Sequence, residues 1–172
     1  MGSGRVVNTE ERVRLRQLIL EQRWAALASL CDDGTPWISF VAYVSEKDFS
    51  GFLMHVSRLA AHTQHLLARP RAALGISAPD DGQEDPQLLA RVNIQGEVSV
   101  IPRGSEDFST ARDLYLARLP QAERLFGFED FVLLRLSPAE ARYVGGFARA
   151  FSLSRQQLHQ LAAKGQDNQI SR

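Results

Sequence analysis

Residues 88–101 show the cleanest alternation of apolar and polar side chains in this sequence. The apolar members are Ala90, Val92, Ile94, Val98 and Val100, and the polar members are Arg91, Asn93, Gln95, Glu97 and Ser99. Because successive side chains of a strand point to opposite faces, this pattern predicts a long strand with its apolar side chains on one face. Gly96 lies inside the strand and indicates a bulge or a bend.

The rest of the sequence divides into apolar runs and helical stretches separated by turn signals. Asp33-Gly34 predicts a tight hairpin between two of the runs. Further strands are expected over 25–31, 37–44, 52–56, 71–77, 131–136 and 140–144, the last two separated by Ser137-Pro138. Helices are expected over about 9–23, 62–68, 105–118 and 121–125, and from 152 to about 164.

These elements predict a mainly β fold of the α+β class. About six strands with hairpin-like or helix-bearing connections, and no regular βαβ alternation, favour an antiparallel barrel with peripheral helices. A length of 172 residues, of which 44% are hydrophobic, suits a single domain over 1–172 with its core at about 9–151. No Gly-x-Gly-x-x-Gly follows a strand and no P-loop pattern is present, so neither common nucleotide-binding motif applies.

Charge and cysteine content exclude several function classes. Lys plus Arg number 20 and Asp plus Glu number 20, so no net field would recruit nucleic acid or an acidic membrane. Cys31 is the only cysteine and cannot form an internal disulfide, which fits a reducing compartment. Because no apolar run approaches the roughly 20 residues that span a bilayer, we expect a cytoplasmic protein. The acidic segment 79–86 lacks the ligand spacing of a calcium loop, so no metal site is expected there.

The stretch from Phe52 to Leu66 combines a strand, a polar turn and the start of a helix. Hydroxyl, guanidinium and imidazole groups lie there beside the free N–H groups of a helix N-terminus, a combination suited to a phosphate. These groups belong to Ser57, Arg58, His62 and Thr63. Ordinary helix capping is the alternative. His62 and His65 also suggest a metal pair, although no third ligand lies nearby.

Five short motifs occur in order along the chain: Gly34-x-Pro36-x-x-Ser39, Val56-Ser57-Arg58-Leu59-Ala60-x-His62-Thr63-x-x-Leu66, Arg69-Pro70-x-Ala72, Arg91-Val92-x-Ile94-x-Gly96 and Gly145-Gly146-Phe147-Ala148-Arg149-Ala150. Together they resemble the FMN-binding split barrels of the pyridoxamine 5'-phosphate oxidase-like family, and most of all its heme-utilisation branch. The resemblance runs from about residue 15 to 151. It implies a six-stranded antiparallel split β-barrel that forms a homodimer, with the cofactor cleft at the interface.

The resemblance also implies a cofactor site. The FMN phosphate would bind the turn formed by Ser57, Arg58, Leu59, His62 and Thr63, and the isoalloxazine would lie beside Ser39, Phe40, Val41 and Ala42. Arg91 stands where the oxidases place a flavin-contacting glutamine, with a surface charge as the alternative. The partner subunit would supply Gly146, Phe147 and Arg149, for which a plain turn is the alternative.

Some positions depart from the pattern of the true oxidases. Tyr115 is kept, but Leu119 and Glu123 stand where an Arg and a Ser of the substrate site are expected, and Ala148 replaces a histidine. The carboxylate of Glu123 would repel a substrate phosphate. Authentic oxidation of vitamin B6 is therefore not expected.

The leading hypothesis from the sequence is an FMN-binding flavoprotein, an oxidoreductase whose substrate or electron acceptor is a small molecule. No residue stands out as catalytic. The alternative is a heme-binding or heme-degrading protein of the heme-utilisation type. In those relatives a C-terminal histidine binds the iron, and only His159 lies beyond Gly146; a solvent-facing place on an amphipathic helix is its other interpretation. A third hypothesis is a non-catalytic relative with an empty cleft.

Overall fold

The computed structural model describes residues 9–83, 85–146 and 149–163. The strands in this part of the chain are β1 (Trp24–Leu30), β2 (Pro36–Ala42), β3 (Val44–Ser45), β4 (Phe52–Ser57), β5 (Arg71–Ser77), β6 (Arg91–Val100), β7 (Phe131–Val144) and β8 (Ala150–Ser154). The helices are α1 (Thr9–Glu21), α2 (Ala61–Ala68), α3 (Glu106–Arg118) and α4 (Arg155–Ala163), with the 3-10 helices η1 (Pro86–Leu88) and η2 (Pro120–Gly127).

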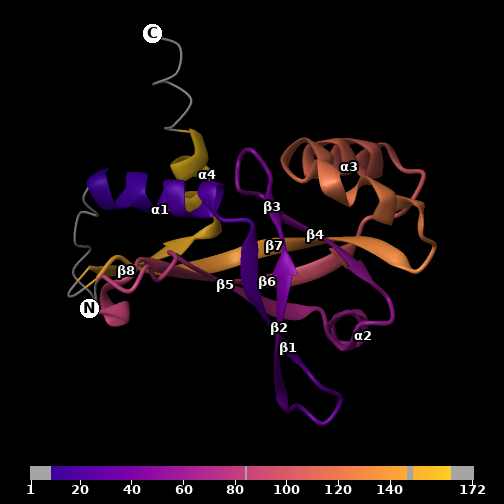
Figure 1. Cartoon of the computed structure of the whole chain (residues 1–172), viewed down its shortest axis with the longest axis horizontal. Coiled ribbons are helices and arrows are strands. Elements are labelled where there is room, and N and C mark those ends of the chain that lie inside the picture. The colour runs from indigo at the N-terminus through magenta and orange to yellow at the C-terminus, as the bar shows by residue number, and fades with distance from the viewer. Residues whose placement is uncertain (1–8, 84, 147–148, 164–172) are drawn as a thin grey trace, which may run out of the picture.

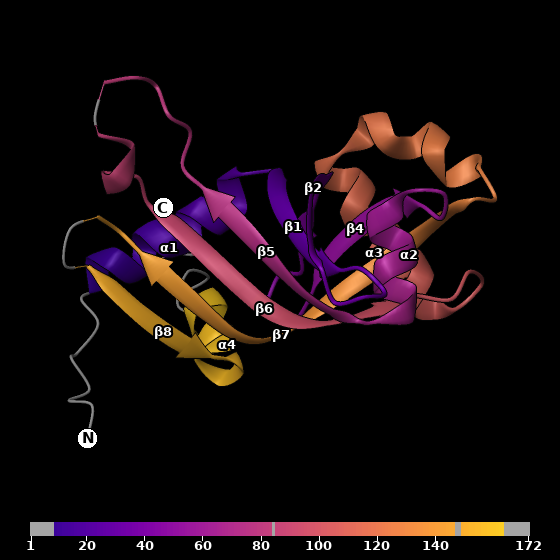
Figure 2. The same cartoon turned by 90° about the horizontal axis from the view of Figure 1, so that it is seen from below.

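The strands form one antiparallel sheet in the order β2-β1-β5-β6-β7-β4-β3, with β8 added along β7 (Figure 1). The sheet coils until β2, at one edge, lies against β4 near the other edge. Helices α1 and α4 lie together at one end of the sheet, and α3 lies at the other end (Figures 1 and 2). Helix α2 packs beside the hairpin formed by β1 and β2.

Two hydrophobic clusters hold these layers together. The larger fills the inside of the coiled sheet and includes Leu27, Val41 and Met54. The smaller lies between the sheet and the α3 layer and includes Leu53 and Tyr115. Strand β4 contributes to both clusters from alternate residues, which explains why it is buried on both faces from Phe52 to Val56.

The structure confirms the expected fold, a mainly β, antiparallel split barrel with peripheral helices. Two short strands, β3 and β8, extend the predicted set of about six. The long strand over 88–101 is present as Arg91–Val100, and its register shifts between Gln95 and Gly96, as the glycine indicated. Among the described residues, no helix is both long and apolar enough to cross a membrane.

The expected break at Ser137-Pro138 is wrong, because β7 runs without interruption from Phe131 to Val144. Proline has no N–H for the ladder and is tolerated in a strand where a bulge removes the need for that bond. Pro138 pairs with Gly96, at the register shift of β6. A Cβ on Gly96 would collide with the backbone of Ser137, so the glycine and the proline accommodate each other.

The start of the last helix was also predicted wrongly. Residues 150–154 form β8, which pairs with the end of β7, and α4 begins only at Arg155. The ring of Phe151 packs against that of Tyr143, and Leu153 pairs with Ala141 and is part of the larger core cluster. The strand therefore forms through contacts with β7, a part of the chain that its local sequence does not reveal.

Candidate functional site

Strand β2 lies at an edge of the sheet. Because side chains alternate along a strand, its two faces carry different residues. Trp37 and Ser39 share the face turned toward α2, where Trp37 Nε1 donates a hydrogen bond to Ser39 Oγ at 3.1 Å. The Trp37 ring meets the His65 ring of α2 edge-on, with 5.8 Å between the ring centroids. We call this surface, formed by Ser29, Trp37, Ser39, His62 and His65, the β2–α2 face.

Two histidines of α2 differ in their surroundings on the β2–α2 face. His65 Nδ1 lies 3.2 Å from the hydroxyl of Ser29, which is 3% exposed on β1. His62 Nε2 is buried and has no hydrogen-bond partner in the described part of the chain. Burial lowers the pKa of His62, and the neighbouring His65 adds to that effect. The ring of His65 thus lies between a hydroxyl and an indole.

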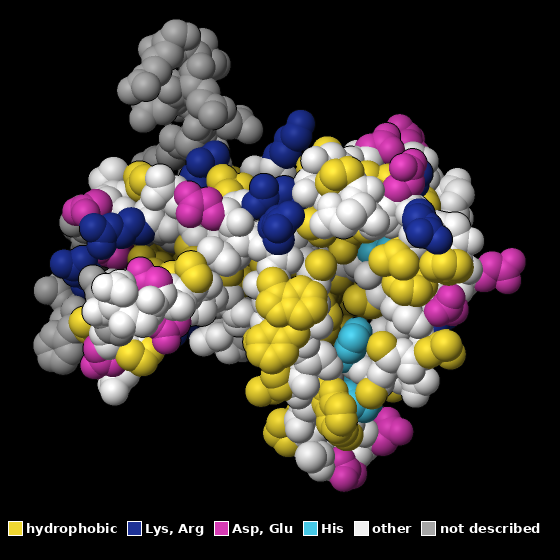
Figure 3. Space-filling view, viewed as in Figure 1, with side chains coloured by type: hydrophobic (Ala, Val, Ile, Leu, Met, Phe, Trp, Pro, Cys, Tyr) yellow, Lys and Arg dark blue, Asp and Glu magenta, His cyan; other side chains and the backbone are white. Residues whose placement is uncertain are grey.

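The opposite face of β2 is an exposed apolar surface. Trp24, Ile38 and Phe40 are 59%, 66% and 60% exposed, and the rings of Trp24 and Phe40 stack with 6.2 Å between centroids. Figure 3 shows apolar side chains gathered over the β1–β2 hairpin, with histidine side chains beside them. We call these three residues the Trp24 patch. Contiguous apolar surface of this kind marks a binding or association site.

The residues expected beside an isoalloxazine therefore divide between two faces. Ser39 belongs to the β2–α2 face, and Val41 points the same way but is buried in the core at 3% exposure. Phe40 belongs to the Trp24 patch, and Ala42 shares its face and is half-buried. The register of β1 and β2 sets this division, since side chains alternate along each strand.

The carboxylate of Asp130 lies against the turn that was expected to bind phosphate. Ser57 Oγ donates to Asp130 Oδ2 at 2.7 Å and accepts from the N–H of Leu59 at 3.1 Å. The backbone N–H of Arg58 donates to the carbonyl of Asp130. The hydroxyl that was expected to bind phosphate is thus held by a negatively charged group from the β7 end of the sheet.

The other members of this turn are oriented differently. Thr63 is fully buried, and its hydroxyl has no hydrogen-bond partner among the described residues. Leu59 is 77% exposed, and Ala60 precedes α2 without a side-chain cap. The Arg58 guanidinium is exposed and makes no hydrogen bond or ion pair within the part of the chain that the structure describes. Arg58 is the cation at this end of α2 that is free to bind an anion.

Arg91 and the segment after β7 lie at the far end of the sheet. Arg91 pairs with Val144 across β6 and β7, and its guanidinium donates to the carbonyls of Gln87 and Leu89. Figures 1 and 2 show β8, which follows this segment, at the opposite end of the molecule from α2. Gly146 adopts a φ of 115°, and Phe147 lies outside the described residues.

Arg149 has a partner within its own chain. Its Nη1 donates to Glu11 Oε1 at 3.2 Å, and Tyr143 Oη donates to Glu11 Oε2 at 3.1 Å. Glu11 is 7% exposed, so Arg149 compensates a nearly buried carboxylate. Burial raises the pKa of Tyr143 to about 12, and the charge of Glu11 contributes to that rise. Within this chain, Arg149 and the phosphate turn do not meet.

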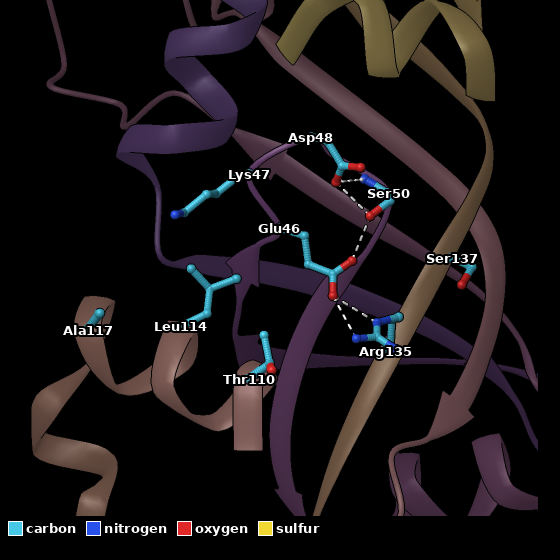
Figure 4. A pocket seen from close by; sticks show the side chains of 9 residues that line it. All are labelled: Glu46, Lys47, Asp48, Ser50, Thr110, Leu114, Ala117, Arg135 and Ser137. Atoms are coloured by element: carbon cyan, nitrogen blue, oxygen red, sulfur yellow. Dashed lines mark hydrogen bonds and ion pairs between the residues drawn. The ribbon is translucent and has the colours of Figure 1, made fainter. Parts of the chain in front are cut away.

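A second surface feature is an open pocket of about 840 Å³ between the 46–50 loop, α3 and β7 (Figure 4). Its guanidinium, from Arg135, is held by Glu46 and Asp107 through contacts of 2.7 Å. The hydrogen bonds to Asp107 raise the pKa of Arg135. His159 of α4 lies near this pocket, with Nδ1 3.5 Å from Asp48. Arg135 is thus paired with two carboxylates, and His159 belongs to this side of the molecule rather than to the β2–α2 face.

The sequence did not reveal the environment of His55. This side chain is 7% exposed and stacks on Phe126 with 3.7 Å between ring centroids and 4° between ring planes. Both ring nitrogens are buried without a hydrogen-bond partner in the described structure. Tyr115, kept from the oxidase pattern, is 2% exposed in the same aromatic layer. It is therefore a packing residue here and does not line an open substrate site.

Comparison with known proteins connects this architecture to one family. A family model described as pyridoxamine 5'-phosphate oxidase matches residues 13–145. The heme oxygenase HutZ of Vibrio cholerae is 26% identical over 150 residues, which cover 81% of this chain and 79% of that protein. The chloroplastic heme oxygenase HOZ of Arabidopsis thaliana is 35% identical over 120 residues, which cover 69% of this chain but only 35% of that relative.

A solved structure gives the same picture. A heme-binding protein from Mycobacterium smegmatis has a TM-score of 0.80 and 28% identity, over 90% of this chain and 62% of that chain. This chain thus spans less than two thirds of that structure and about a third of the Arabidopsis relative. All three relatives carry names that refer to heme.

Proposed function

The chain belongs to the pyridoxamine 5'-phosphate oxidase family, and from that premise we propose that it is a heme-binding protein of the heme-utilisation type. Three relatives, from Vibrio cholerae, Arabidopsis thaliana and Mycobacterium smegmatis, are named as heme-binding or heme-oxygenase proteins. This reverses the order of the two hypotheses drawn from the sequence, in which FMN came first and heme second.

The observation that carries the proposal is the position of Asp130. An FMN phosphate bound at Ser57 would lie next to the carboxylate that already accepts the Ser57 hydroxyl at 2.7 Å. Two anions at hydrogen-bond distance from one hydroxyl repel each other strongly. A heme does not need that hydroxyl, because most of its surface is apolar.

The residues of the β2–α2 face fit a heme. Trp37 is 44% exposed there and offers an aromatic wall, and the imidazole of His65 lies next to it. Arg58, just before α2, has a guanidinium without a partner among the described residues, and this group would bind a propionate. Bound heme would supply the iron chemistry, whereas these side chains would bind the macrocycle, orient it and limit the access of water.

We also propose that two copies of the chain associate and that the cofactor cleft lies at their interface. The Trp24 patch supports this, because its three large apolar side chains are each more than half exposed on an edge hairpin. Such a surface loses unfavourable contact with water when a second copy covers it. In a dimer, the segment around Gly146 and Arg149 of one copy could approach the β2–α2 face of the other.

A pair of titrations tests the cofactor. Purified full-length protein is titrated with hemin and, separately, with FMN, and absorbance and flavin fluorescence are recorded. We expect a saturable Soret band with hemin and no saturable response with FMN. Saturable FMN binding without saturable heme binding would reverse the proposal. Adding a reductant and oxygen to the heme complex then tests degradation, which appears as loss of the Soret band relative to a sample without reductant.

Light scattering after size exclusion tests the association. We expect a mass of about twice 19.2 kDa for the native chain and a monomer for Phe40→Lys, which places a charge in the Trp24 patch. Phe128→Lys is the matched control, since Phe128 is 49% exposed outside the patch. A monomeric native protein, or equal effects of the two substitutions, would contradict an interface at β2.

A further inference from the structure

We propose that Nε2 of His65 is the protein ligand of the heme iron, held in place by Ser29 and Trp37. This inference deepens the proposed function and rests on it. It concerns one atom on the β2–α2 face and can therefore fail while heme binding itself is confirmed.

The hydrogen bond to Ser29 suits an iron ligand. An imidazole that binds a metal through one nitrogen almost always donates the N–H of its other nitrogen, in most cases to a carboxylate, a backbone carbonyl or water. His65 Nδ1 lies 3.2 Å from Ser29 Oγ, and a hydroxyl oxygen accepts such a bond. When Nδ1 carries the proton, the lone pair of the imidazole is on Nε2, the atom that would face the iron.

The two partners of His65 are themselves held in place. Ser29 is 3% exposed in β1, a strand paired on both sides by β2 and β5. Trp37 packs edge-on against the imidazole and is fixed by its own hydrogen bond to Ser39 Oγ at 3.1 Å. The ring of His65 is thus oriented by groups from two neighbouring strands, which is the kind of support that a ligand residue needs.

Nε2 of His65 is free to bind. Within the described residues Nε2 makes no hydrogen bond or ion pair, and it retains some exposure to solvent. It therefore faces solvent on the β2–α2 face, beside the ring of Trp37. An imidazole nitrogen is a suitable ligand for iron.

The other three histidines suit this role less well. His55 lies in the aromatic layer under α3, with both nitrogens closed off from solvent. His62 has its Nε2 buried. His159, the ligand expected from the heme-utilisation relatives, lies on α4 beside Asp48 and the charged pocket of Figure 4. A carboxylate can support a ligand histidine, so Asp48 does not itself exclude His159. His65 is preferred because it lies beside Trp37 and on the helix that follows Arg58.

Hemin titrations of two variants, each with one histidine replaced, test the assignment, with absorption and electron paramagnetic resonance spectra recorded for each complex. His65→Ala is expected to weaken hemin binding by about tenfold or more and to remove the spectrum of a histidine-bound iron. Free imidazole should restore that spectrum by entering the space left by the side chain. His159→Ala is the matched control and should keep the native spectrum.

Two further variants separate ligation from folding. His65→Gln retains a side chain of similar size and should lose the histidine-bound spectrum while keeping the native circular dichroism. Ser29→Ala leaves the ligand present but removes its acceptor, and should weaken heme binding by about tenfold without abolishing the iron–histidine bond.

The outcomes distinguish the two levels of inference. If the native protein binds hemin and His65→Ala has the same affinity and spectrum, the ligand assignment is wrong and the proposed function stands. If His159→Ala alone loses the histidine-bound spectrum, the C-terminal histidine is the ligand instead. If the native protein does not bind hemin, the proposed function fails and this assignment fails with it.

Discussion

Replacing His55 with phenylalanine should make the protein markedly less sensitive to mild acid. His55 is 7% exposed, its two nitrogens have no partner among the described residues, and aromatic rings surround it. Burial lowers the pKa of His55 from 6.5 to about 4, and the positive charge of Arg103 adds to this. The folded protein therefore holds His55 neutral under conditions in which the unfolded chain would protonate it.

The sign and size of the effect follow from proton linkage. Above pH 6.5 the histidine is neutral in both the folded and the unfolded chain, so its titration does not change the free energy of unfolding. As the pH falls from about 6.5 toward 4, only the unfolded chain binds the proton, and the free energy of unfolding decreases. The full difference between the two values corresponds to about 3 kcal/mol, of which about 2 kcal/mol would be lost between pH 7 and pH 5. A phenylalanine side chain at this position has no proton to bind, so this part of the loss should disappear.

Urea unfolding at pH 7 and pH 5, at one ionic strength, measures the difference. The native protein should lose about 2 kcal/mol more of its free energy of unfolding than His55→Phe over this interval. His159→Gln is the control, because it removes an imidazole from α4 and leaves the His55 layer intact; it must retain the extra loss. Equal losses in the native protein and in His55→Phe would refute the reasoning.

Three further perturbations address the bulge, the buried carboxylate and the anion turn. Gly96→Ala should lower the free energy of unfolding by about 1–3 kcal/mol in thermal melts, because its Cβ collides with the β7 backbone. Gly127→Ala is the control, since a Cβ there meets no atom within 4 Å, and it should lower the free energy of unfolding by less. Glu11→Gln should lower the pKa of Tyr143 from its present value of about 12, as absorbance at alkaline pH would show, whereas an unchanged tyrosine titration would contradict the contact. Asp130→Asn removes a negative charge from the turn and should strengthen FMN binding by about tenfold or more; no gain in fluorescence titrations would mean that Asp130 is not what opposes the phosphate.

The strands and most helices could be predicted from the sequence because their signals are local. Alternation over 88–101 and the Asp33-Gly34 turn are examples, and both elements are present. The continuity of β7 through Pro138 could not be predicted, because it depends on Gly96 in the neighbouring strand. The strand over 150–154 likewise requires the end of β7 as its partner.

The site was less accessible to sequence reasoning, since its decisive contacts join distant residues. The order of the short motifs led to the right family but not to Asp130, which meets Ser57 across 73 positions of the chain. The bond between Ser29 and His65 spans 36 positions. A serine in a strand and a histidine in a helix carry no local sign that they will meet, whereas the packing of α2 beside the β1–β2 hairpin brings them together.

The edge strand β2 has a consequence for how this protein can change over time. Its odd-numbered residues Trp37 and Ser39 face α2, and its even-numbered residues Ile38 and Phe40 form the outer patch. Substitutions at one set can alter ligand preference while the other set, and the self-association we assign to it, stays intact. Deletion or insertion of a single residue in β2 exchanges the two sets. We therefore expect this hairpin to tolerate point substitutions during evolution and not to tolerate a change in the length of β2.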